Sequence, residues 1–261
     1  MAKHQLSGIH ALVTGASSGL GYAMAYALLK EGATVAVASR GGNKLSDVVE
    51  RFRQEGLDAH ELSIDVRSAS SIEAAKDWVV NSWGKLDVLV NNAGIGMRTV
   101  NPKFLFEPQP FYEVSPEGFK DLIDTNLTGY FLVSRTFAPL MVKQGYGRII
   151  NISMNHETMR RKGFVPYGPS RAGAESLSYI MAEDLRDSGV AVNMLLPGGA
   201  TRTGMLPDEY SEVYDSMPNI LSPAIMARPI VFLASPAAAG ITGERIVATE
   251  FDEWIKRRVG K

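Results

Sequence analysis

The chain has 261 residues, of which 45% are hydrophobic and 21% charged, so it is long enough to bury a large core in a single domain. It contains no cysteine, which excludes disulfides and thiolate metal sites and leaves any redox chemistry to a bound cofactor. The formal net charge of -1, and the lack of any apolar run near the roughly 18 residues that span a bilayer, predict a soluble cytoplasmic protein that binds neither nucleic acid nor membrane.

Short apolar, β-branched runs recur along the chain and predict strands at residues 10–15, 34–39, 59–65, 86–92, 147–153, 190–197 and 245–249. The segments between them have helical spacing, at about residues 20–32, 42–55, 69–83, 115–143, 167–188 and 222–235. Strand and helix in one alternating order indicate parallel strands joined by crossovers. We therefore expect a single-domain α/β fold over residues 1–261, a Rossmann-type doubly wound parallel sheet of about seven strands with helices on both faces.

Two stretches break this regularity, residues 95–114 and 198–221, and both follow strand ends. Because ligands of open α/β sheets bind outside the carboxyl ends of the strands, these stretches are candidate walls of a substrate pocket. The first contains Phe104, Phe106, Phe111 and Tyr112, which could line an apolar pocket or form the small core of the loop itself. Neither stretch has a pattern tied to one class of substrate.

The segment TGASSGLG, residues 14–21, follows the first predicted strand and opens the first helix. Gly15 permits a tight turn, Gly19 lets the backbone approach a pyrophosphate, and Gly21 allows the helix to pack against the sheet. The helix amino terminus adds free N–H groups and a partial positive charge. This context predicts dinucleotide binding rather than a merely tight turn. The expected contacts are Gly15, Ser17, Ser18, Gly19, Leu20 and Gly21.

The spacing Gly-x-x-x-Gly-x-Gly resembles that of the short-chain dehydrogenase/reductase family, and further motifs match in order from about residue 6 to residue 250. These motifs are Asp65-Val66, Asn91-Asn92-Ala93-Gly94, Asn126 in TNLTGYF, the strand IINIS, YGPSR at residues 167–171, and Pro197-Gly198. The resemblance implies cofactor contacts at Asp65 and Val66 (adenine), Asn92, Ala93, Gly94, Tyr167, Arg171, Pro197 and Gly198, with Thr201 and Thr203 at the nicotinamide end. It also implies a homotetramer or homodimer that pairs helices 115–143 and 167–188.

The end of the second predicted strand reads Ala38-Ser39-Arg40, without the carboxylate that would bind the ribose hydroxyls of NAD. Arg40 carries a permanently charged fork that suits a phosphate, and Ser39 adds a hydroxyl donor. The sequence therefore predicts NADP(H) in preference to NAD(H). A solvated surface arginine is the alternative, and Ser18 is neutral where many NADP-preferring relatives carry a base.

In YGPSR, Tyr167 would be the general acid/base of the family, and Asn126 would hold a water of the proton relay. A free tyrosine with a pKa of about 10 is a poor base, and a nearby cation favours its phenolate. The family normally has lysine four residues after this tyrosine, but here the residue is Arg171. Arginine keeps the charge and can bind the ribose, yet it does not release a proton, so we expect slower proton supply. The alternatives are a core or interface role for Tyr167 and a helix-surface charge for Arg171.

A second departure concerns the family serine thirteen residues before the tyrosine, a position held here by Met154. Ser153 is one place off and should point away unless the strand end is bulged. Asn155 or His156 could donate to the substrate oxygen instead. The loss of one such donor costs about 10² to 10³ in rate in other enzymes.

Two hypotheses follow from these residues. The first is an NADPH-linked oxidoreductase that interconverts a small-molecule carbonyl and a secondary alcohol, with Tyr167, Arg171, Asn126 and Ser153 as the catalytic set. The second is a dinucleotide-binding protein that senses NADP(H) or serves as a subunit, which Met154 and Arg171 motivate. No cluster of His, Asp or Glu predicts a metal. Near the carboxyl end, Trp254 is either a packing anchor or a partner contact.

Overall fold

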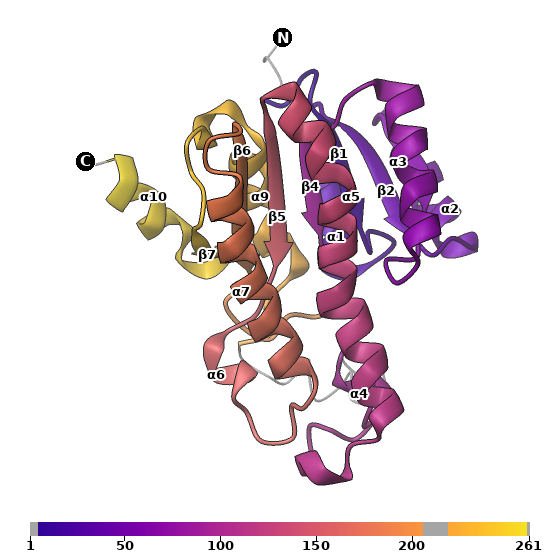
Figure 1. The fold of residues 1–261 in the computed structure, drawn as a ribbon, viewed down its shortest axis with the longest axis vertical. Helices are drawn as coiled ribbons and strands as arrows, with labels where there is room; N and C mark the ends of the chain where they lie inside the picture. Colours follow the sequence, from indigo (N-terminus) through magenta and orange to yellow (C-terminus); the bar gives the residue numbers. More distant parts are fainter. Residues whose placement is uncertain (1–4, 206–218, 260–261) are drawn as a thin grey trace.

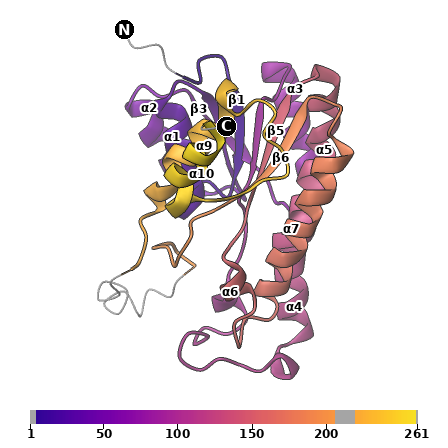
Figure 2. The same ribbon diagram turned by 90° about the vertical axis from the view of Figure 1, so that its left-hand side faces the viewer.

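The computed structural model describes residues 5–205 and 219–259, which form a parallel sheet between two layers of helices (Figures 1 and 2). The sheet has seven strands in the order β3-β2-β1-β4-β5-β6-β7. The strands are β1 (His10–Thr14), β2 (Thr34–Ser39), β3 (Ala59–Ser63), β4 (Val88–Asn91), β5 (Gly147–Ile152), β6 (Val190–Leu196) and β7 (Arg245–Val247). Strands are added to one side of β1 up to β3 and to its other side from β4 onward, so the strand order reverses between the neighbours β1 and β4. A crevice is expected beyond the carboxyl ends of these two strands. The predicted fold class is confirmed.

The helices divide between the two faces of the sheet (Figure 2). One face is covered by α1 (Gly19–Lys30), α2 (Asn43–Gln54), α9 (Ala227–Ala234) and α10 (Phe251–Val259). The other is covered by α3 (Ala69–Trp83), α5 (Gly129–Gln144) and α7 (Tyr167–Asp184). Two short helices, α4 (Pro116–Ile123) and α6 (His156–Met159), lie beyond the carboxyl ends of the strands, in the lower part of Figure 1.

The side chains of the strands alternate between these two layers. In β1, Ala11 and Val13 join the core on the α1 side, whereas Leu12 joins the core on the α5 side. In β4, Val90 and Leu89 divide in the same way. Because both faces of the central strands are buried, β1, β2, β4 and β5 read as nearly continuous apolar runs, whereas the edge strand β3 carries His60 and Glu61.

The predicted helix at residues 115–143 is interrupted. It consists of α4, a π-helical turn at Asp124–Thr128, and α5. The helix predicted to reach residue 188 ends at Asp184, and the strands predicted at 59–65 and 245–249 end at Ser63 and Val247. The stretch 222–235 begins with a 3₁₀ turn at Pro223–Met226 before α9. Apart from the π-helical turn, these differences lie at element ends, where local spacing carries the least information.

Helix α10 was not predicted from the charged carboxyl-terminal tail. Phe251, Trp254 and Ile255 have the helical spacing i, i+3, i+4, and their rings and alkyl groups pack on the α9 side of the core. The Phe232 ring lies 5.6 Å from Phe251 and 5.9 Å from Trp254. Of the two alternatives for Trp254, the structure shows the packing anchor. Across residues 5–205 and 219–259, no helix has the length and apolar character that a bilayer crossing requires.

Candidate active site

The glycine loop between β1 and α1 fits tightly against the end of β4. Gly15 has a φ of +64°, and a Cβ at this position would lie 2.7 Å from the Cα of Ala93. A Cβ at Gly21 would lie 2.4 Å from the carbonyl oxygen of Gly15. The Thr14 hydroxyl oxygen accepts from the backbone N–H groups of Asn92 and Ala93, each at 3.0 Å. Glycine is therefore required at both positions for the loop to lie against β4.

The amino terminus of α1 is open to an anion. Its N-cap residue, Ser18, makes no side-chain capping bond with the described part of the chain, and the first turn carries no acidic side chain. The first N–H groups of a helix have no partner within it, so they are free to bind phosphate oxygens. A Cβ at Gly19 would lie 3.3 Å from Thr203, which brings the segment after β6 against this helix end.

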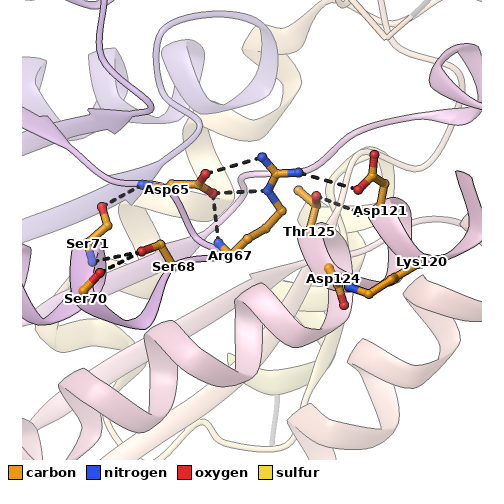
Figure 3. A network of polar contacts seen from close by, with 9 residues as sticks. All are labelled: Asp65, Arg67, Ser68, Ser70, Ser71, Lys120, Asp121, Asp124 and Thr125. Carbon is orange, nitrogen blue, oxygen red and sulfur yellow. Dashed lines mark hydrogen bonds and ion pairs between the residues drawn. The ribbon is translucent and has the colours of Figure 1, made fainter. Parts of the chain in front are cut away.

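The ends of β2 and β3 carry the polar groups predicted for the adenosine half of a cofactor. Ser39 is half-buried, and Arg40 is exposed and makes no hydrogen bond or ion pair with residues 5–205 or 219–259. The Asp65 carboxylate accepts from the backbone N–H of Arg67 at 3.0 Å and from its guanidinium at 3.4 Å (Figure 3). Arg67 also pairs with Asp121 at 3.8 Å.

The carboxyl group of Asp65 is held in its charged form. Partial burial acts to raise its pKa, but the hydrogen bonds and charge of Arg67 outweigh burial, and the pKa lies below its usual value. Val66 beside it is buried, and a Cβ at Gly129 would lie 2.9 Å from its Cγ2. The Asp65-Val66 motif is thus fixed between the ends of β3 and α5.

Arg171 is buried beneath the ring of Tyr167 and is only 3% exposed. Its Nη1 donates to the hydroxyl oxygen of Tyr130 at 2.7 Å and to the carbonyl of Ile152 at 3.0 Å. The guanidinium carbon lies 5.3 Å from the centre of the Tyr167 ring and 5.5 Å from that of Tyr130. The cation therefore lies between two phenols. Its burial does not fit the alternative of a helix-surface charge and is compatible with the predicted electrostatic role.

The rest of the guanidinium is tightly surrounded. A Cβ at position 94 would lie 2.6 Å from Nη2, so Gly94 leaves the room that Arg171 needs. The Nε atom is buried without a hydrogen-bond partner among the described residues. Burial acts to lower the pKa of Arg171, but the phenols of Tyr130 and Tyr167 raise it, and the net pKa lies above the usual value. Burial likewise raises the pKa of Tyr130. Arg171 is therefore a permanent cation beside a neutral Tyr130 phenol.

Tyr167 lines a cavity of about 230 Å³ beyond the carboxyl ends of β4, β5 and β6. Its hydroxyl lies 3.7 Å from the Sδ atom of Met205, and its ring centre lies 6.5 Å from that of Phe164. Phe104 packs edge-on against Phe164 at 5.7 Å and is buried in the cavity wall. Phe106, Phe111 and Tyr112 are instead exposed, so of the four aromatic residues named in the 95–114 stretch Phe104 alone has the predicted role in the pocket wall, and within the described part of the chain the other three form neither pocket nor loop core.

Asn126 is fully buried in the π-helical turn between α4 and α5. Its side chain accepts from the backbone N–H of Ile95 at 2.8 Å and donates to the carbonyl of the same residue at 2.9 Å. It also donates to the Ser170 hydroxyl at 3.4 Å. Asn91 makes a similar internal link, with its amide donating to Ser134 and Asn151 at 2.8 Å each. Both asparagines tie the end of β4 to neighbouring elements.

Met154 holds the position of the family serine, and the side chains next to it point in different directions. Ser153 donates to Glu175 Oε1 at 2.6 Å, and the same carboxylate accepts from Arg245 Nε at 2.9 Å and contacts His156 Nε2 at 3.1 Å. Its hydroxyl proton is thus directed toward α7, in agreement with the alternation expected for a strand end. Met154 and Asn155 line the cavity, and Asn155 donates to the carbonyl of Gly198 at 3.0 Å.

The predicted site residues fall into two groups along the crevice. One group lines the cavity with Tyr167: Leu20, Asn92, Ser153, Arg171, Pro197, Thr201 and Thr203. Ser17, Ser18, Ser39, Arg40 and Asp65 do not line it: the first two lie in the loop between β1 and α1, and the other three follow or end β2 and β3. Residues 206–218 of the predicted 198–221 wall lie outside the described residues. Within the described part of the chain, no group of three or more His, Asp or Glu side chains is arranged to hold a metal.

Sequence reasoning missed Tyr130, Glu175 and Arg161, which lines the same cavity. For Tyr130 the available signal was physical: an arginine inside a helix that faces the core needs buried acceptors, and a tyrosine on a neighbouring helix can supply one. Sequence spacing alone does not identify which tyrosine. Glu175 is the buried partner of Arg245 in β7, a contact between distant segments.

Comparison with known proteins shows the family of this chain. Residues 9–213 match the family described as short chain dehydrogenase. The chain is 34% identical over 242 residues to the 3-oxoacyl-(acyl-carrier-protein) reductase FabG of Staphylococcus aureus, covering 90% of this chain and 94% of that protein. It resembles the crystal structure of a gluconate 5-dehydrogenase from Burkholderia cenocepacia in complex with NADP and tartrate (TM-score 0.82, 27% identity, 96% of this chain and 98% of that one). It also resembles 3-ketoacyl-(acyl-carrier-protein) reductase from Brucella melitensis complexed with NADH (TM-score 0.80, 29% identity, 93% and 97%). The protein is therefore an oxidoreductase of the short-chain dehydrogenase family.

Proposed function

We propose that this oxidoreductase interconverts a carbonyl and a secondary alcohol with NADP(H), using Tyr167 as general acid and base. The observation that carries the proposal is the buried cation beneath the phenol, with the Arg171 guanidinium carbon 5.3 Å from the Tyr167 ring at the wall of a cavity that also adjoins the glycine loop. A permanent cation stabilises negative charge that develops on a neighbouring oxygen during a reaction.

The residues present fit a nicotinamide dinucleotide. The glycine loop and the open end of α1 would hold its pyrophosphate, Asp65 and Val66 its adenine, and Thr201, Thr203, Pro197 and Gly198 its nicotinamide end. The unpartnered Nε–H of Arg171 is a buried donor that a ribose hydroxyl would satisfy. When bound, the cofactor supplies or accepts the hydride.

Selection of NADP(H) rests on the end of β2. Arg40 is exposed without a partner among the described residues, and Ser39 beside it is half-buried. The chain offers no carboxylate at this strand end to bind two ribose hydroxyls or to repel a phosphate. One relative was crystallised with NADP and another with NADH, so family membership leaves this choice to Arg40 and Ser39.

The substrate oxygen needs a donor besides Tyr167, and we assign it to Asn155. The Asn155 amide has two N–H groups, and its bond to the carbonyl of Gly198 leaves the second for the substrate. The single hydroxyl proton of Ser153 is given to Glu175. Arg171 holds the charge but cannot relay a proton, so proton exchange with water proceeds from Tyr167 itself. Asn126 acts by positioning Ile95 beside the cavity.

A second candidate is a protein that binds NADP(H) without turnover. It is favoured by Met154, which offers no proton, and by the two bonds that Arg171 Nη1 already makes inside the protein. A panel of ketones, aldehydes and oxo acids distinguishes the two candidates, with NADPH oxidation followed by absorbance. Turnover of any member supports the enzyme, whereas tight NADPH binding without turnover supports the sensor or subunit.

We also propose that two or four copies associate through α5 and α7. Phe131 and Val142 on α5, and Tyr179 and Ile180 on α7, are large apolar side chains exposed to solvent. Apolar side chains clustered on helix faces are typical of surfaces buried between subunits. Light scattering of the purified chain gives the number of copies.

A further inference from the structure

Arg161 lies in the turn that connects α6 and α7, beyond the carboxyl end of the sheet (Figure 1). The backbone of this turn is fixed on both sides, because Arg161 donates its N–H to the carbonyl of Thr158 at 3.3 Å and accepts from the N–H of Phe164 at 3.2 Å. The guanidinium carbon lies 5.3 Å from the centre of the Phe164 ring, whose centre is 6.5 Å from that of Tyr167. Arg161 is thus one aromatic ring away from Tyr167 and lines the same cavity.

Nothing in the described part of the chain neutralises this cation. Arg161 makes no side-chain hydrogen bond or ion pair with residues 5–205 or 219–259. The described residues that line the cavity include two arginines, Arg161 and Arg171, and no aspartate or glutamate. By contrast Arg160, the neighbouring base, donates to the carbonyl of His156 at 3.3 Å and does not line the cavity. The charge of the described lining residues is therefore positive, which favours the binding of an anion.

We propose that Arg161 binds an anionic group of the substrate, a carboxylate or a phosphate, while Tyr167 acts on a carbonyl or hydroxyl of the same molecule. The proposal rests on the oxidoreductase function proposed above and names its substrate class. A guanidinium suits this task because its planar fork binds two oxygens of a carboxylate or phosphate at once. The cation–π contact with the Phe164 ring at 5.3 Å favours a guanidinium position at the cavity wall.

The wall between Arg161 and Tyr167 restricts the substrate further. Phe164, Phe104 and Met154 are all buried and apolar, and Phe104 meets Phe164 edge-on. Hydroxyl groups placed against this wall would lose hydrogen bonds to water without gaining partners. The substrate class that fits is an oxo or hydroxy acid, or the corresponding phosphate monoester, in which a short hydrocarbon segment separates the anion from the reacting carbon.

The decisive experiment compares each oxo acid of a short-chain series with its own methyl ester. The ester keeps the reacting carbonyl and the hydrocarbon segment but lacks the charge. We expect Arg161→Gln to lower the acid-to-ester ratio of kcat/KM by about ten- to a hundredfold, because a hydrogen bond to a charged group is lost. The change should appear chiefly in the KM for the acid. Arg161→Lys, which keeps the charge without the fork, should lose less.

Arg160→Gln is the matched control, because it removes the same charge one residue away and outside the cavity. An unchanged acid-to-ester ratio in Arg161→Gln, or an equal fall in Arg160→Gln, overturns the proposal. Phosphate monoesters of hydroxyketones assayed alongside show which anion depends more strongly on Arg161. Turnover of other ketones or aldehydes but of no compound in this series overturns the substrate class and leaves the oxidoreductase function standing. Without turnover of any carbonyl compound, calorimetric titration of the hydroxy acids into NADP-loaded protein tests Arg161 separately, and equal binding by wild type and Arg161→Gln counts against the proposal.

Discussion

Arg171 and Tyr130 form a buried pair in which the guanidinium Nη1 lies 2.7 Å from the phenol oxygen. Tyr130 in turn donates to the carbonyl of Ile152 at 3.2 Å, which Arg171 also contacts. The contact joins α5, α7 and the end of β5 under the ring of Tyr167. The position of the Arg171 cation thus depends on a second phenol that does not itself line the cavity.

Replacing Tyr130 with phenylalanine should reduce both stability and turnover. The change leaves a buried guanidinium N–H without its acceptor, so the free energy of unfolding should fall by about 1.5–3 kcal/mol. Urea denaturation of the variant and the wild type measures this difference. Tyr146→Phe is the control, because Tyr146 accepts from Arg148 at 2.9 Å outside the cavity. That variant should lose stability without a change in kcat. Equal kcat values for Tyr130→Phe and wild type would contradict the positioning role.

Tyr167→Phe should abolish turnover while NADPH still binds. The ring remains to cover Arg171, but the proton donor is gone, and general acid–base catalysis of this kind contributes about 10² to 10⁴ in rate. Steady-state rates and fluorescence titration with NADPH measure the two effects separately. A variant that retained its rate would remove Tyr167 from the mechanism.

Asn155→Ala and Ser153→Ala should differ. Loss of the Asn155 amide should lower kcat by about 10² to 10³, as for other donors to a developing oxyanion. Ser153→Ala should change kcat much less, because the Ser153 proton is given to Glu175 rather than to the cavity. Rates measured with one substrate at saturating NADPH are sufficient. The reverse order of effects would transfer the donor role to Ser153.

Arg40→Gln should weaken NADPH binding by about ten- to a hundredfold, since a charge-assisted contact with the 2′-phosphate is lost. NADH lacks that phosphate, so its dissociation constant should change far less. Titration of both cofactors into wild type and variant tests the assignment. Tighter binding of NADH than of NADPH by the wild type would show that the cofactor preference is wrong.

His10 should make folding sensitive to mild acid. Burial of its imidazole and the charge of Lys85 lower its pKa below 6.5, against the opposing effect of Asp87. The unfolded chain then takes up a proton near pH 6.5, whereas the folded chain does so only at lower pH. Stability is therefore present above pH 6.5 and falls as the pH drops from there to the folded pKa. His10→Gln should flatten this part of the curve of unfolding free energy against pH; superimposable curves would contradict the assignment.

The architecture was predictable because strands and helices alternate along the whole chain, and their hydrophobic patterns are visible in the sequence. Apolar runs such as the one that forms β4 alternate with amphipathic helices, and this order alone specifies parallel crossovers. The glycine loop was also predictable, because its glycines follow the first strand at the spacing of a dinucleotide-binding loop. In the structure, a Cβ at Gly15 or Gly21 would meet backbone atoms. Element ends and α10 were harder, because they depend on tertiary partners such as Phe232.

The sequence predicted the residues of the candidate site better than it predicted the contacts between them. The family motif pointed to Tyr167 and Arg171 as candidates, and strand alternation, which is local, predicted the orientation of Ser153. Neither signal identified Tyr130 or Arg161, since one approaches from α5 and the other from a turn whose course is set by packing on Phe164. Contacts of this kind join segments that are distant in sequence, and no local pattern encodes them.

The close approach of Gly94 to the guanidinium matters for any redesign of this site. A lysine introduced at position 171 would leave empty the volume now held by Nη1 and Nη2, and its single ammonium group cannot reproduce the planar contact with Tyr130. Restoring the usual lysine of the family would therefore remove a buried partner of Tyr130 as well as exchange one cation for another.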